Sequence, residues 1–590
     1  MLSSRVSLWG LRVLAALAVA TAIVAPFYLA RRSAQPSPNH TLIVPNTHDM
    51  AQHLAVMEQF DKVLRTGTLY PRWLPDFNNG YGLAWTNFYP PGLYYVTSLV
   101  NAAVNNWMYT MFVVSLLGLA ASGLSFYLLS RLFYGQLASA VAALIYMAAP
   151  YHTLDLYWRG AVPELMGFVL VPAIVYFAFK LGTCGNARYF AGLGFFHGIY
   201  IVTHFPVAYL MTYVLAFYAV SRAVRERDWK IAVRIGLGIA IALVLGSIYW
   251  VPAALEANQV AEQFSRIYPY DKSYVTLLPG GDDFGHVLNV SFIAQAVTLI
   301  VTIWLLYSVR RSESVVPGGS VDHDPMPAAA QWTCTRQWVL MAVATTFMCT
   351  SFSIYISRLI PKIDAVSFAW RWLVIATFFT SLVVAAAIDR LRKPGVLSLR
   401  MSWVYRGALI AALGLSVWFT IGSVIIPTRS RVNLIRPQNF LESGFMPAGA
   451  TPPQQLPPGP LATIQPPSGA VQVVRWEPLH REVRVDSAQP AILKLKTYNF
   501  VGWTARVDGE PAQLSSDTNG AQIMNLPAGE HTVEVFFAST PSRTFGGALT
   551  GAGFLLICGL MGADFVKRRK TSAKGAGERK SNPSEDAAQE

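Results

Sequence analysis

The residues of this chain best suited to chemistry begin with a carboxylate and an imidazole one helical turn apart. Asp49 and His53 lie in the stretch HDMAQHLAVMEQFDKVLRTGTLYPRW, residues 48–73. A spacing of four places both side chains on one face of a helix, which we expect to begin at Asp49 and to end near Arg65. An ionised aspartate at a helix N-terminus is stabilised by the helix dipole. The pair therefore offers a general base or, with both side chains as ligands, a site for a divalent metal such as Mg or Mn.

A simpler interpretation of the same stretch stays open. Asp49 can be a helix-capping residue, and His53 a solvated side chain on an amphipathic helix that lies along the membrane surface. The residues that follow, GTLYPRWLPDFNNGYGLAWTNFYPPGLYYV, are dense in aromatics, Gly, Asn and Pro. They predict an ordered, non-helical loop. Its aromatic rings, Tyr89 among them, suit either sugar faces or a membrane interface.

A second group of charged residues lies in PYHTLDLYWRGAVPELMGF, residues 150–168. Asp155 and Arg159 are four residues apart and can simply pair. Because charges at the mouth of a membrane helix are costly unless paired or functional, Arg159 can instead bind a phosphate through its planar guanidinium. Arg371, in VSFAWRWL, is a second phosphate candidate, with interfacial snorkelling as the alternative. His204, in THFP, is either a substrate contact or a hydrogen-bonded packing histidine.

The elements that position these residues must be membrane-spanning helices. The 590-residue chain is 53% hydrophobic and 13% charged, about half the charge of an ordinary soluble protein. Many apolar runs of about 20 residues can each cross a hydrocarbon core of roughly 30 Å. The net charge of +14 fits basic residues gathered in cytoplasmic loops. Because those residues are scattered at helix ends rather than along one face, we expect no nucleic-acid partner.

We predict a polytopic α-helical membrane protein with about twelve transmembrane helices and a small extracytoplasmic β-domain. The predicted spans are 8–30, 107–130, 137–150, 163–181, 188–203, 206–222, 231–252, 287–309, 338–358, 368–388, 405–426 and 546–565. With the N-terminus inside, every even-numbered span ends in basic residues, as the positive-inside rule requires. Both termini are therefore expected in the cytoplasm, and the charged groups above outside it.

The predicted domain organisation follows from composition. Runs of alternating polarity such as REVRVD, AILKLKTYN and HTVEVFF are separated by turn residues and predict an antiparallel β-sandwich-like domain. The chain divides into a transmembrane domain over 1–426 with an external loop at 31–106, a Pro-rich linker at 427–470, the β-domain at 471–545, a last span at 546–565 and a disordered cytoplasmic tail at 566–590.

These stretches together resemble a known family. HDMAQHLAVMEQFDKVLRTGTLYPRW, followed by NNGYG and FYPPGLYY, resembles the first external loop of bacterial membrane proteins called 6-pyruvoyl-tetrahydropterin synthase-related. The architecture is similar to the GT-C glycosyltransferase superfamily and its YfhO-like branch. The second charged stretch, THFP, VSFAWRWL, and YNFVGWTARVDGEPA with LPAGEHTVEVFF continue the resemblance. The chain shows no His-rich zinc pattern of the soluble pterin enzyme.

The resemblance implies a role for each candidate residue. Asp49 matches the catalytic carboxylate of the GT-C enzymes, although many of them carry an acidic pair where this chain has His48 and Met50 beside it. The implied substrate-binding residues are His53, Tyr89, Asp155, Tyr157, Arg159, Glu164, His204 and Arg371.

The resulting hypothesis is a glycosyltransferase of the bacterial inner membrane. A polyprenyl-phosphate sugar is the donor, with its lipid tail among membrane lipids in a groove between helices and its phosphate near Arg159 and Arg371. Asp49 deprotonates the hydroxyl of an extracytoplasmic glycan, lipid or polymer acceptor, which attacks the anomeric carbon with inversion. The alternatives are a transporter or flippase for a lipid-linked glycan, and a non-catalytic membrane assembly protein. No clear internal repeat supports the transporter.

Overall fold

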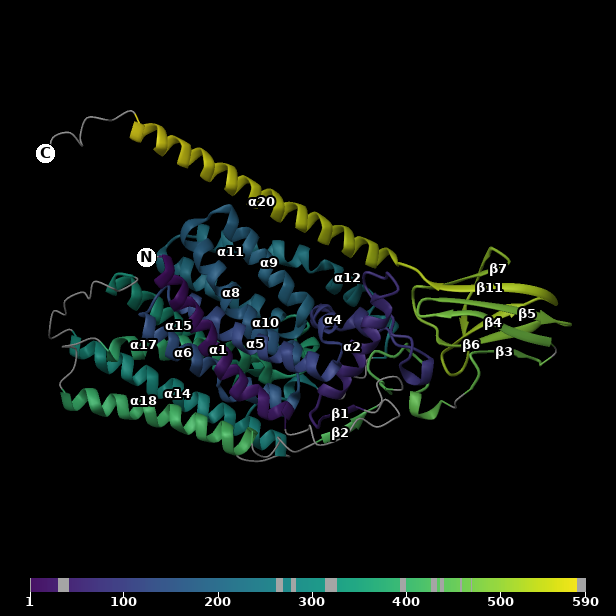
Figure 1. Cartoon of the computed structure of the whole chain (residues 1–590), viewed down its shortest axis with the longest axis horizontal. Coiled ribbons are helices and arrows are strands. Elements are labelled where there is room, and N and C mark those ends of the chain that lie inside the picture. Colours follow the sequence, from purple (N-terminus) through teal and green to yellow (C-terminus); the bar gives the residue numbers. More distant parts are fainter. Residues whose placement is uncertain are drawn as a thin grey trace.

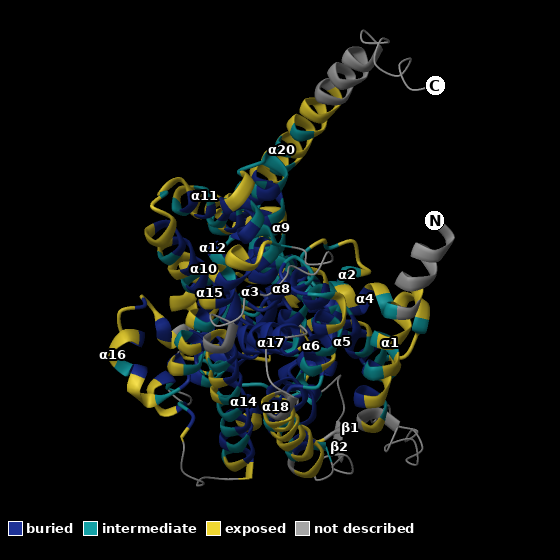
Figure 2. Cartoon of the chain, turned by 90° about the vertical axis from the view of Figure 1, so that its left-hand side faces the viewer, coloured by how far each residue is buried: buried dark blue, intermediate teal, exposed yellow. Residues whose placement is uncertain are grey.

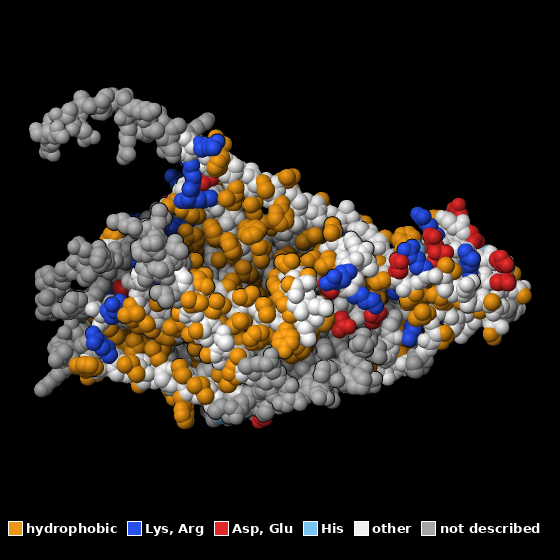
Figure 3. Space-filling model, in the orientation of Figure 1, with side chains coloured by type: hydrophobic (Ala, Val, Ile, Leu, Met, Phe, Trp, Pro, Cys, Tyr) orange, Lys and Arg blue, Asp and Glu red, His pale blue; other side chains and the backbone are white. Residues whose placement is uncertain are grey.

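The computed structural model of the chain describes residues 2–29, 42–261, 269–276, 283–313, 326–392, 399–425, 432–435, 440–456, 459–467 and 469–580. These residues form a bundle of long helices with a β-rich part at one end (Figure 1). The start of α1 and the far end of α20 lie toward the opposite end. Figure 3 shows a broad apolar surface over the bundle, as expected where helices face lipid.

A helix occupies each of the twelve predicted spans. They are α1 (Leu2–Leu29), α5 (Trp107–Ser130), α6 (Gln136–Met147), α8 (Val162–Cys184), α9 (Ala187–Thr203), α10 (Phe205–Glu226), α11 (Lys230–Leu245) with α12 (Ser247–Leu255), α14 (Asp283–Glu313), α15 (Ala328–Met348), α17 (Trp372–Leu391), α18 (Leu399–Phe419) and α20 (Pro541–Lys580). Among the described residues, eight helical segments are long and apolar enough to cross a membrane, and the α11–α12 pair, bent by 71°, makes a ninth. α9, with 17 residues, is shorter than the roughly 20 residues of a usual span.

Helix α17 forms the middle of the bundle. Of its most apolar stretch, 94% is buried inside the protein, and it packs against α6, α14 and α15. Figure 2 shows it as a buried element surrounded by partly exposed helices. A helix that is apolar all round is stable in this position because no face of it meets polar solvent.

The predicted external loop, residues 31–106, is more helical in its described part than the sequence predicts. Its described part contains β1 (Leu42–Pro45), α2 (Met50–Leu64), η1 (Asn78–Gly80), α3 (Trp85–Phe88) and α4 (Gly92–Val104). The stretch from Gly67 to Pro91 is largely non-helical, as predicted, but the last five residues of the predicted loop begin α4. α2 is also buried on most of its surface, because it packs against α4, α5 and β1.

The β-rich part consists of two antiparallel sheets. One has the strand order β3-β6-β10-β9 and the other β4-β5-β11-β7-β8. The strands are β3 (Ala462–Gln465), β4 (Gly469–Glu477), β5 (His480–Ser487), β6 (Ala491–Tyr498), β7 (Trp503–Val507), β8 (Glu510–Ala512), β9 (Ser515–Ser516), β10 (Ala521–Leu526) and β11 (Gly529–Phe537). Residues Val483, Leu493 and Val533 share one core with Trp73 of the first loop, so the β-rich part is packed onto that loop.

The described parts of the predicted linker and the predicted disordered tail contain regular structure. The Pro-rich linker provides β3, and its Met446 and Leu456 are buried; proline limits the backbone without preventing such apolar contacts. A separate two-stranded sheet pairs β1 with β2 (Val432–Ile435). α20 continues to Lys580, so residues 566–580 of the predicted tail are helical, since Ala, Lys, Arg and Glu favour helix. Residues 581–590 lie outside the described residues.

Glu256, just after α12, links the first loop, the bundle and the start of α20. Its Oε2 accepts hydrogen bonds from Asn87 Nδ2 and from Arg543 Nη2, each at 2.9 Å. Its Oε1 accepts hydrogen bonds from Thr540 and Ser542. Because Glu256 and Arg543 are both buried, each charge depends on the other for compensation.

We expect Glu256→Ala to loosen this junction selectively. Amide hydrogen exchange should become faster in residues 85–89 and 538–543 and stay unchanged in α17, because only the junction loses its acceptor. Mass spectrometry of the whole protein in detergent measures both. Glu477→Ala, which removes a half-exposed partner of Arg475, is the matched control and should change neither region. Unchanged exchange at 538–543 would contradict the proposed role of Glu256.

Candidate active site

The site is built where the start of α2 meets the turn between α7 (Pro150–Leu154) and α8. That turn is η2 (Asp155–Arg159) followed by Gly160. His48 N donates to Trp158 O at 3.1 Å, and Asp49 N donates to Arg159 O at 2.8 Å. Gly160 has a φ of +63°, and a Cβ there would lie 2.3 Å from Thr47 Oγ1. The two segments approach this closely because residue 160 has no side chain.

Asp49 is the N-cap residue of α2, but its side chain makes no capping hydrogen bond. Thr47 Oγ1 accepts the hydrogen bond from Met50 N instead, at 3.2 Å. The Asp49 side chain is one-third exposed, and its Oδ2 lies 3.8 Å from Arg159 Nη2. The carboxylate is therefore not used for capping, and it is the accessible edge of a charged cluster.

Arg159 and Glu164 form the buried centre of that cluster. Arg159 Nη1 donates to Asp155 Oδ1 at 2.8 Å and to Glu164 Oε2 at 2.5 Å. Tyr151 donates from its hydroxyl to Glu164 Oε1 at 2.7 Å. Asp155 and Glu164 are fully buried and Arg159 is nearly so. Asp155 and Arg159 thus pair, as the simpler interpretation of their spacing proposes, but Glu164 shares the arginine.

Two further predicted residues reach Glu164 from distant helices. His204, between α9 and α10, places Nε2 3.7 Å from Glu164 Oε2. Arg371, which precedes α17, places Nε 3.5 Å from the same oxygen. Arg371 Nη1 donates to Val366 O, whereas its buried Nε has no hydrogen-bond partner among the described residues. Arg371 is therefore buried rather than snorkelling, and it is less fully paired than Arg159.

His53 and Tyr89 lie beside the cluster. His53 Nδ1 is 3.2 Å from the Tyr94 hydroxyl, and the His53 and Tyr89 rings are 5.7 Å apart. His53 is 1% exposed, so the interpretation of a solvated histidine is wrong. Burial lowers the pKa of His53 to about 4, although the charge of Asp49 opposes the shift. Burial likewise raises the pKa of Tyr89, so both side chains are neutral at pH 7.

This burial predicts a stability loss in acid. Between about pH 6.5 and pH 4 the unfolded chain protonates His53 while the folded chain does not, so the free energy of unfolding falls as pH falls through that window. The full shift corresponds to about 3 kcal/mol. Comparing melting temperatures at pH 7 and pH 4.5 should show a smaller acid loss for His53→Leu than for the unmodified protein. His286→Leu, at an exposed position, is the control, and an equal loss in both variants would contradict the assignment.

Tyr157 does not join the cluster, although the family resemblance implies substrate binding. Its hydroxyl donates to Ile23 O of α1 at 2.8 Å, and the side chain is fully buried. The residue therefore holds α1 against η2, the element that carries Asp155 and Arg159 of the cluster.

Two further residues of the site, Tyr151 and Glu442, are not among the candidates predicted from the sequence. Tyr151 lies in the second charged stretch, four residues before Asp155, so its helical spacing could have indicated it. Glu442, in the predicted linker, accepts hydrogen bonds from Gln52 Nε2 and from Gly444 N. Burial raises the pKa of Glu442, and the charge of Asp49 adds to the shift. No local pattern marks Glu442, because a segment far along the chain brings it to α2.

The predicted metal site is not supported by the residues around Asp49. Among the described residues, no three His, Cys, Asp or Glu side chains gather in a metal-binding arrangement. Asp49 and His53 would supply one carboxylate and one imidazole, and the Arg159 guanidinium beside Asp49 would repel a cation. This donor set does not fit a resident ion.

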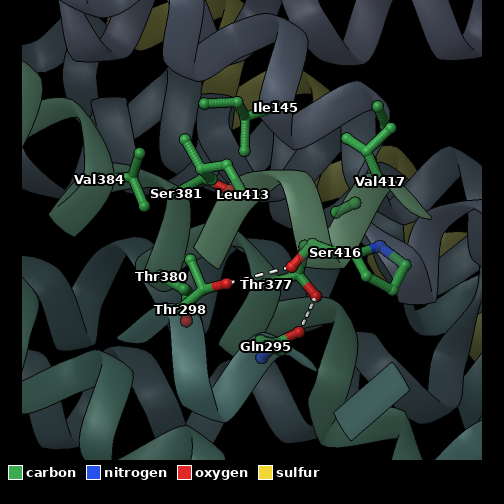
Figure 4. Close-up of a pocket in the computed structure, with 13 residues that line it drawn as sticks. Ile145, Gln295, Thr298, Thr377, Thr380, Ser381, Val384, Leu413, Ser416 and Val417 are labelled. Atoms are coloured by element: carbon green, nitrogen blue, oxygen red, sulfur yellow. Dashed lines mark hydrogen bonds between the residues drawn. The ribbon is translucent and has the colours of Figure 1, made fainter. Parts of the chain in front are cut away.

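A cavity of about 60 Å³ lies within the bundle (Figure 4). Its wall combines Ile145, Val384 and Leu413 with hydroxyl and amide side chains of α14, α17 and α18. Thr377 donates to Gln295 Oε1 at 2.7 Å. Pro150 lines the cavity, and the next residue, Tyr151, contacts Glu164, so α7 separates the cavity from the charged cluster.

Several solved structures are similar to this chain. The arabinofuranosyltransferase AftD from Mycobacteria is 15% identical, with a TM-score of 0.43 over 70% of this chain and 27% of AftD. ArnT from Cupriavidus metallidurans, bound to undecaprenyl phosphate, is 13% identical, with a TM-score of 0.39 over 71% of this chain and 76% of ArnT. The Archaeoglobus fulgidus oligosaccharyltransferase is 12% identical, with a TM-score of 0.36 over 72% of this chain and 56% of that enzyme. The chain thus spans about a quarter of the length of AftD.

Sequence comparison gives the family. No curated protein matches the chain. Residues 86–426 match the sequence profile of a family of membrane proteins. This range contains the buried residues Asp155, Arg159, Glu164, His204 and Arg371, whereas Asp49 precedes it. Because the match covers more than half of the sequence, this chain belongs to the family described as 6-pyruvoyl-tetrahydropterin synthase related domain, membrane protein.

Proposed function

We propose that this protein is a membrane glycosyltransferase that moves a sugar from a polyprenyl-phosphate donor to an acceptor hydroxyl, with Asp49 as general base. The observation that carries the proposal is the state of Asp49. Its carboxylate makes no capping hydrogen bond, is one-third exposed and lies at the edge of a buried cluster containing two arginines. A carboxylate that is held in place yet accessible suits proton abstraction from a bound hydroxyl.

The proposed reaction is a single inverting displacement. Asp49 takes the proton of the acceptor hydroxyl, and the acceptor oxygen attacks the anomeric carbon of the donor sugar. The bond from that carbon to the phosphate oxygen breaks, and the bonding electrons leave with the polyprenyl phosphate. The leaving group gains negative charge, so a nearby fixed cation stabilises the transition state more than the ground state.

Arg371 is the better candidate for that cation. Arg159 donates to Asp155 and Glu164 and is close to fully paired. Arg371 lies 3.5 Å from Glu164, and its Nε has no hydrogen-bond partner in the described part of the chain. We assign phosphate binding to Arg371 alone. Arg159 instead holds the carboxylates of Asp155 and Glu164 in place. The sequence suggests both arginines as phosphate ligands.

The charge distribution supports an extracytoplasmic site. Glu164, His204 and Arg371 lie at the starts of α8, α10 and α17, whereas Lys180, Arg225 and Arg390 lie near the ends of the same helices. Basic residues concentrate on the cytoplasmic side of membrane proteins. We therefore place the site and the β-rich part outside the cytoplasm, in the inner membrane of a bacterium, with both termini inside.

The lipid-linked donor is supported by the environment of the site. The cluster lies among helices long and apolar enough to cross a membrane, and a cavity that combines apolar side chains with hydroxyl and amide groups adjoins it across α7. A hydrocarbon tail in such a place keeps its apolar environment while its phosphate meets Arg371. We propose that the acceptor is a glycan, lipid or polymer hydroxyl.

The test uses purified full-length protein in proteoliposomes that contain polyprenyl-phosphate sugars carrying a radiolabel on the sugar. We expect one donor to release polyprenyl phosphate and to transfer its label to an added mixture of envelope glycans and lipids. Movement of intact donor between leaflets without release would instead indicate a flippase. Neither release nor movement with any donor would indicate an assembly protein, and either result overturns the proposal.

A further inference from the structure

The segment between α15 and α17 has an unusual distribution of polarity. The sequence analysis places residues up to 358 in a membrane span, but α15 ends at Met348 and is followed by η5 (Ser351–Ser353) and α16 (Ile354–Ser357). Four apolar side chains of this segment are largely exposed, with exposures of 75% for Phe352, 78% for Tyr355, 51% for Ile356 and 80% for Leu359, whereas Ile360 is buried. Two serines, Ser353 and Ser357, are buried. We call residues 351–362 the interfacial segment.

The two buried serines have hydrogen-bond partners, so their hydroxyl groups are buried without an unsatisfied donor or acceptor. Ser353 Oγ donates to Met348 O at 3.2 Å and lies 3.3 Å from Ser357 Oγ. The four outward residues are spaced at i, i+3, i+4 and i+7, which gathers them on one side. In water this arrangement would be reversed, with serines outside and large apolar residues inside. The outer face of the interfacial segment is therefore suited to an apolar medium.

The position of the interfacial segment indicates that this apolar medium is the lipid membrane. It follows the last turn of α15 and precedes the first turn of α17, and the Tyr209 hydroxyl near the start of α10 donates to Pro361 O. Two of these helix ends, the starts of α10 and α17, carry His204 and Arg371 of the charged cluster. Figure 2 shows α16 standing out to the side of the bundle, largely exposed. A short segment that extends sideways from the ends of membrane helices is expected to lie at the boundary between lipid headgroups and acyl chains.

Two further features favour lipid over a protein partner. The outward face of α15 is also apolar, with Leu340, Val343 and Phe347 exposed, so the outer face of the interfacial segment continues a surface that already faces the membrane. Arg358 and Lys362 are exposed on the interfacial segment, where they can meet lipid phosphates. The exposed Asp364 follows outside it.

We propose that the interfacial segment is a lipid anchor, buried in the boundary layer of the same leaflet as the charged cluster and binding phospholipid headgroups through Arg358 and Lys362. The anchor would also set the depth of the site. Soon after the segment, Val366 O accepts the hydrogen bond from Arg371 Nη1. Lipid contact at Leu359 would thus hold Arg371 at the level of lipid phosphates. The proposal concerns the membrane contact alone and does not depend on glycosyl transfer.

The test places the photocrosslinker p-benzoyl-phenylalanine at position 359 of the full chain in nanodiscs of phosphatidylethanolamine and phosphatidylglycerol. The same replacement at Leu237, an exposed residue within α11, is the lipid-facing control, and at Ile492, 41% exposed in β6, the water-facing control. All three side chains are exposed, so the replacements leave the packing intact. After illumination, peptide mass spectrometry should find lipid adducts at 359 at a level comparable to 237 and several-fold above 492.

An adduct yield at 359 no higher than at 492 would show that the interfacial segment meets water, and the anchor would be excluded. The same three variants are illuminated in native membranes. A protein crosslink at 359 that replaces the lipid adduct there would show that the face binds a protein partner, which also overturns the proposal.

Discussion

Replacing Asp49 with asparagine is expected to lower the rate of sugar transfer by about 10²- to 10⁴-fold, the range that a positioned general base contributes. Asparagine keeps the size of the side chain and its polarity but cannot accept the proton of the acceptor hydroxyl. Because Asp49 is one-third exposed and makes no capping hydrogen bond, the substitution should leave folding intact. Release of polyprenyl phosphate in proteoliposomes measures the rate, and a melting curve checks the fold.

A matched control lies on the same helix. Asp61→Asn removes a carboxylate of α2 that pairs with the exposed Arg65 at 2.6 Å, three turns away from the cluster. Asp61 is largely buried, but Arg65 is 61% exposed, so solvent screens the pair and it should contribute at most about 1 kcal/mol. This variant should therefore transfer sugar at the unmodified rate. Full activity of Asp49→Asn would eliminate Asp49 as the base. Loss of activity in both variants would instead indicate a general requirement for α2.

Glu164→Gln is expected to have the largest effect on stability, a loss of about 3 to 5 kcal/mol in the free energy of unfolding. Glu164 is fully buried and compensates Arg159 at 2.5 Å and Arg371 at 3.5 Å. Glutamine keeps the shape but removes the charge, which leaves Asp155, among the described residues of the cluster, as the one fully buried carboxylate against two buried guanidinium groups. Chemical unfolding of the purified protein in detergent measures the change.

The control for this prediction is another glutamate that pairs with two arginines. Glu226 lies at the end of α10, is about one-third exposed and pairs with Arg222 at 2.8 Å and Arg225 at 3.0 Å. Because solvent can replace its contacts, Glu226→Gln should cost less than about 1 kcal/mol. Equal losses in the two variants would mean that burial of Glu164 adds nothing, which contradicts the description of the cluster.

Together the two predictions distinguish a residue that acts in the reaction from a residue that stabilises the fold. Asp49 is accessible and should affect the rate without affecting stability, whereas Glu164 is inaccessible and should affect stability first. The residues of the cluster come from η2, from the starts of α2, α8 and α17, and from the α9–α10 junction. Such a cluster can hold one accessible carboxylate in a fixed orientation, because the cost of burying the other charges is offset by their mutual pairing.

The local features of this protein were predictable from its sequence. The span positions follow from runs of apolar residues, and the bounds of α2 follow from its polar start and its apolar spacing. The alternation of polarity in β5, where Arg481, Val483 and Val485 face inward, likewise identifies a strand with one buried face. Each of these properties depends on residues only a few positions apart along the chain, so it can be predicted from the sequence alone.

Other properties depend on contacts between distant segments, and only the tertiary structure decided them. His53 has the spacing of a surface residue, but Tyr94 of α4 covers it. Glu442 reaches Gln52 from 390 residues away. The i, i+3, i+4, i+7 pattern from Phe352 to Leu359 defines one apolar face, but periodicity cannot tell whether that face turns toward protein or lipid. The amino-acid sequence by itself determined which segments are helical, membrane-crossing or extended. The packing of those segments decided which charges are paired, buried or accessible, because burial and electrostatic compensation arise only when remote residues meet.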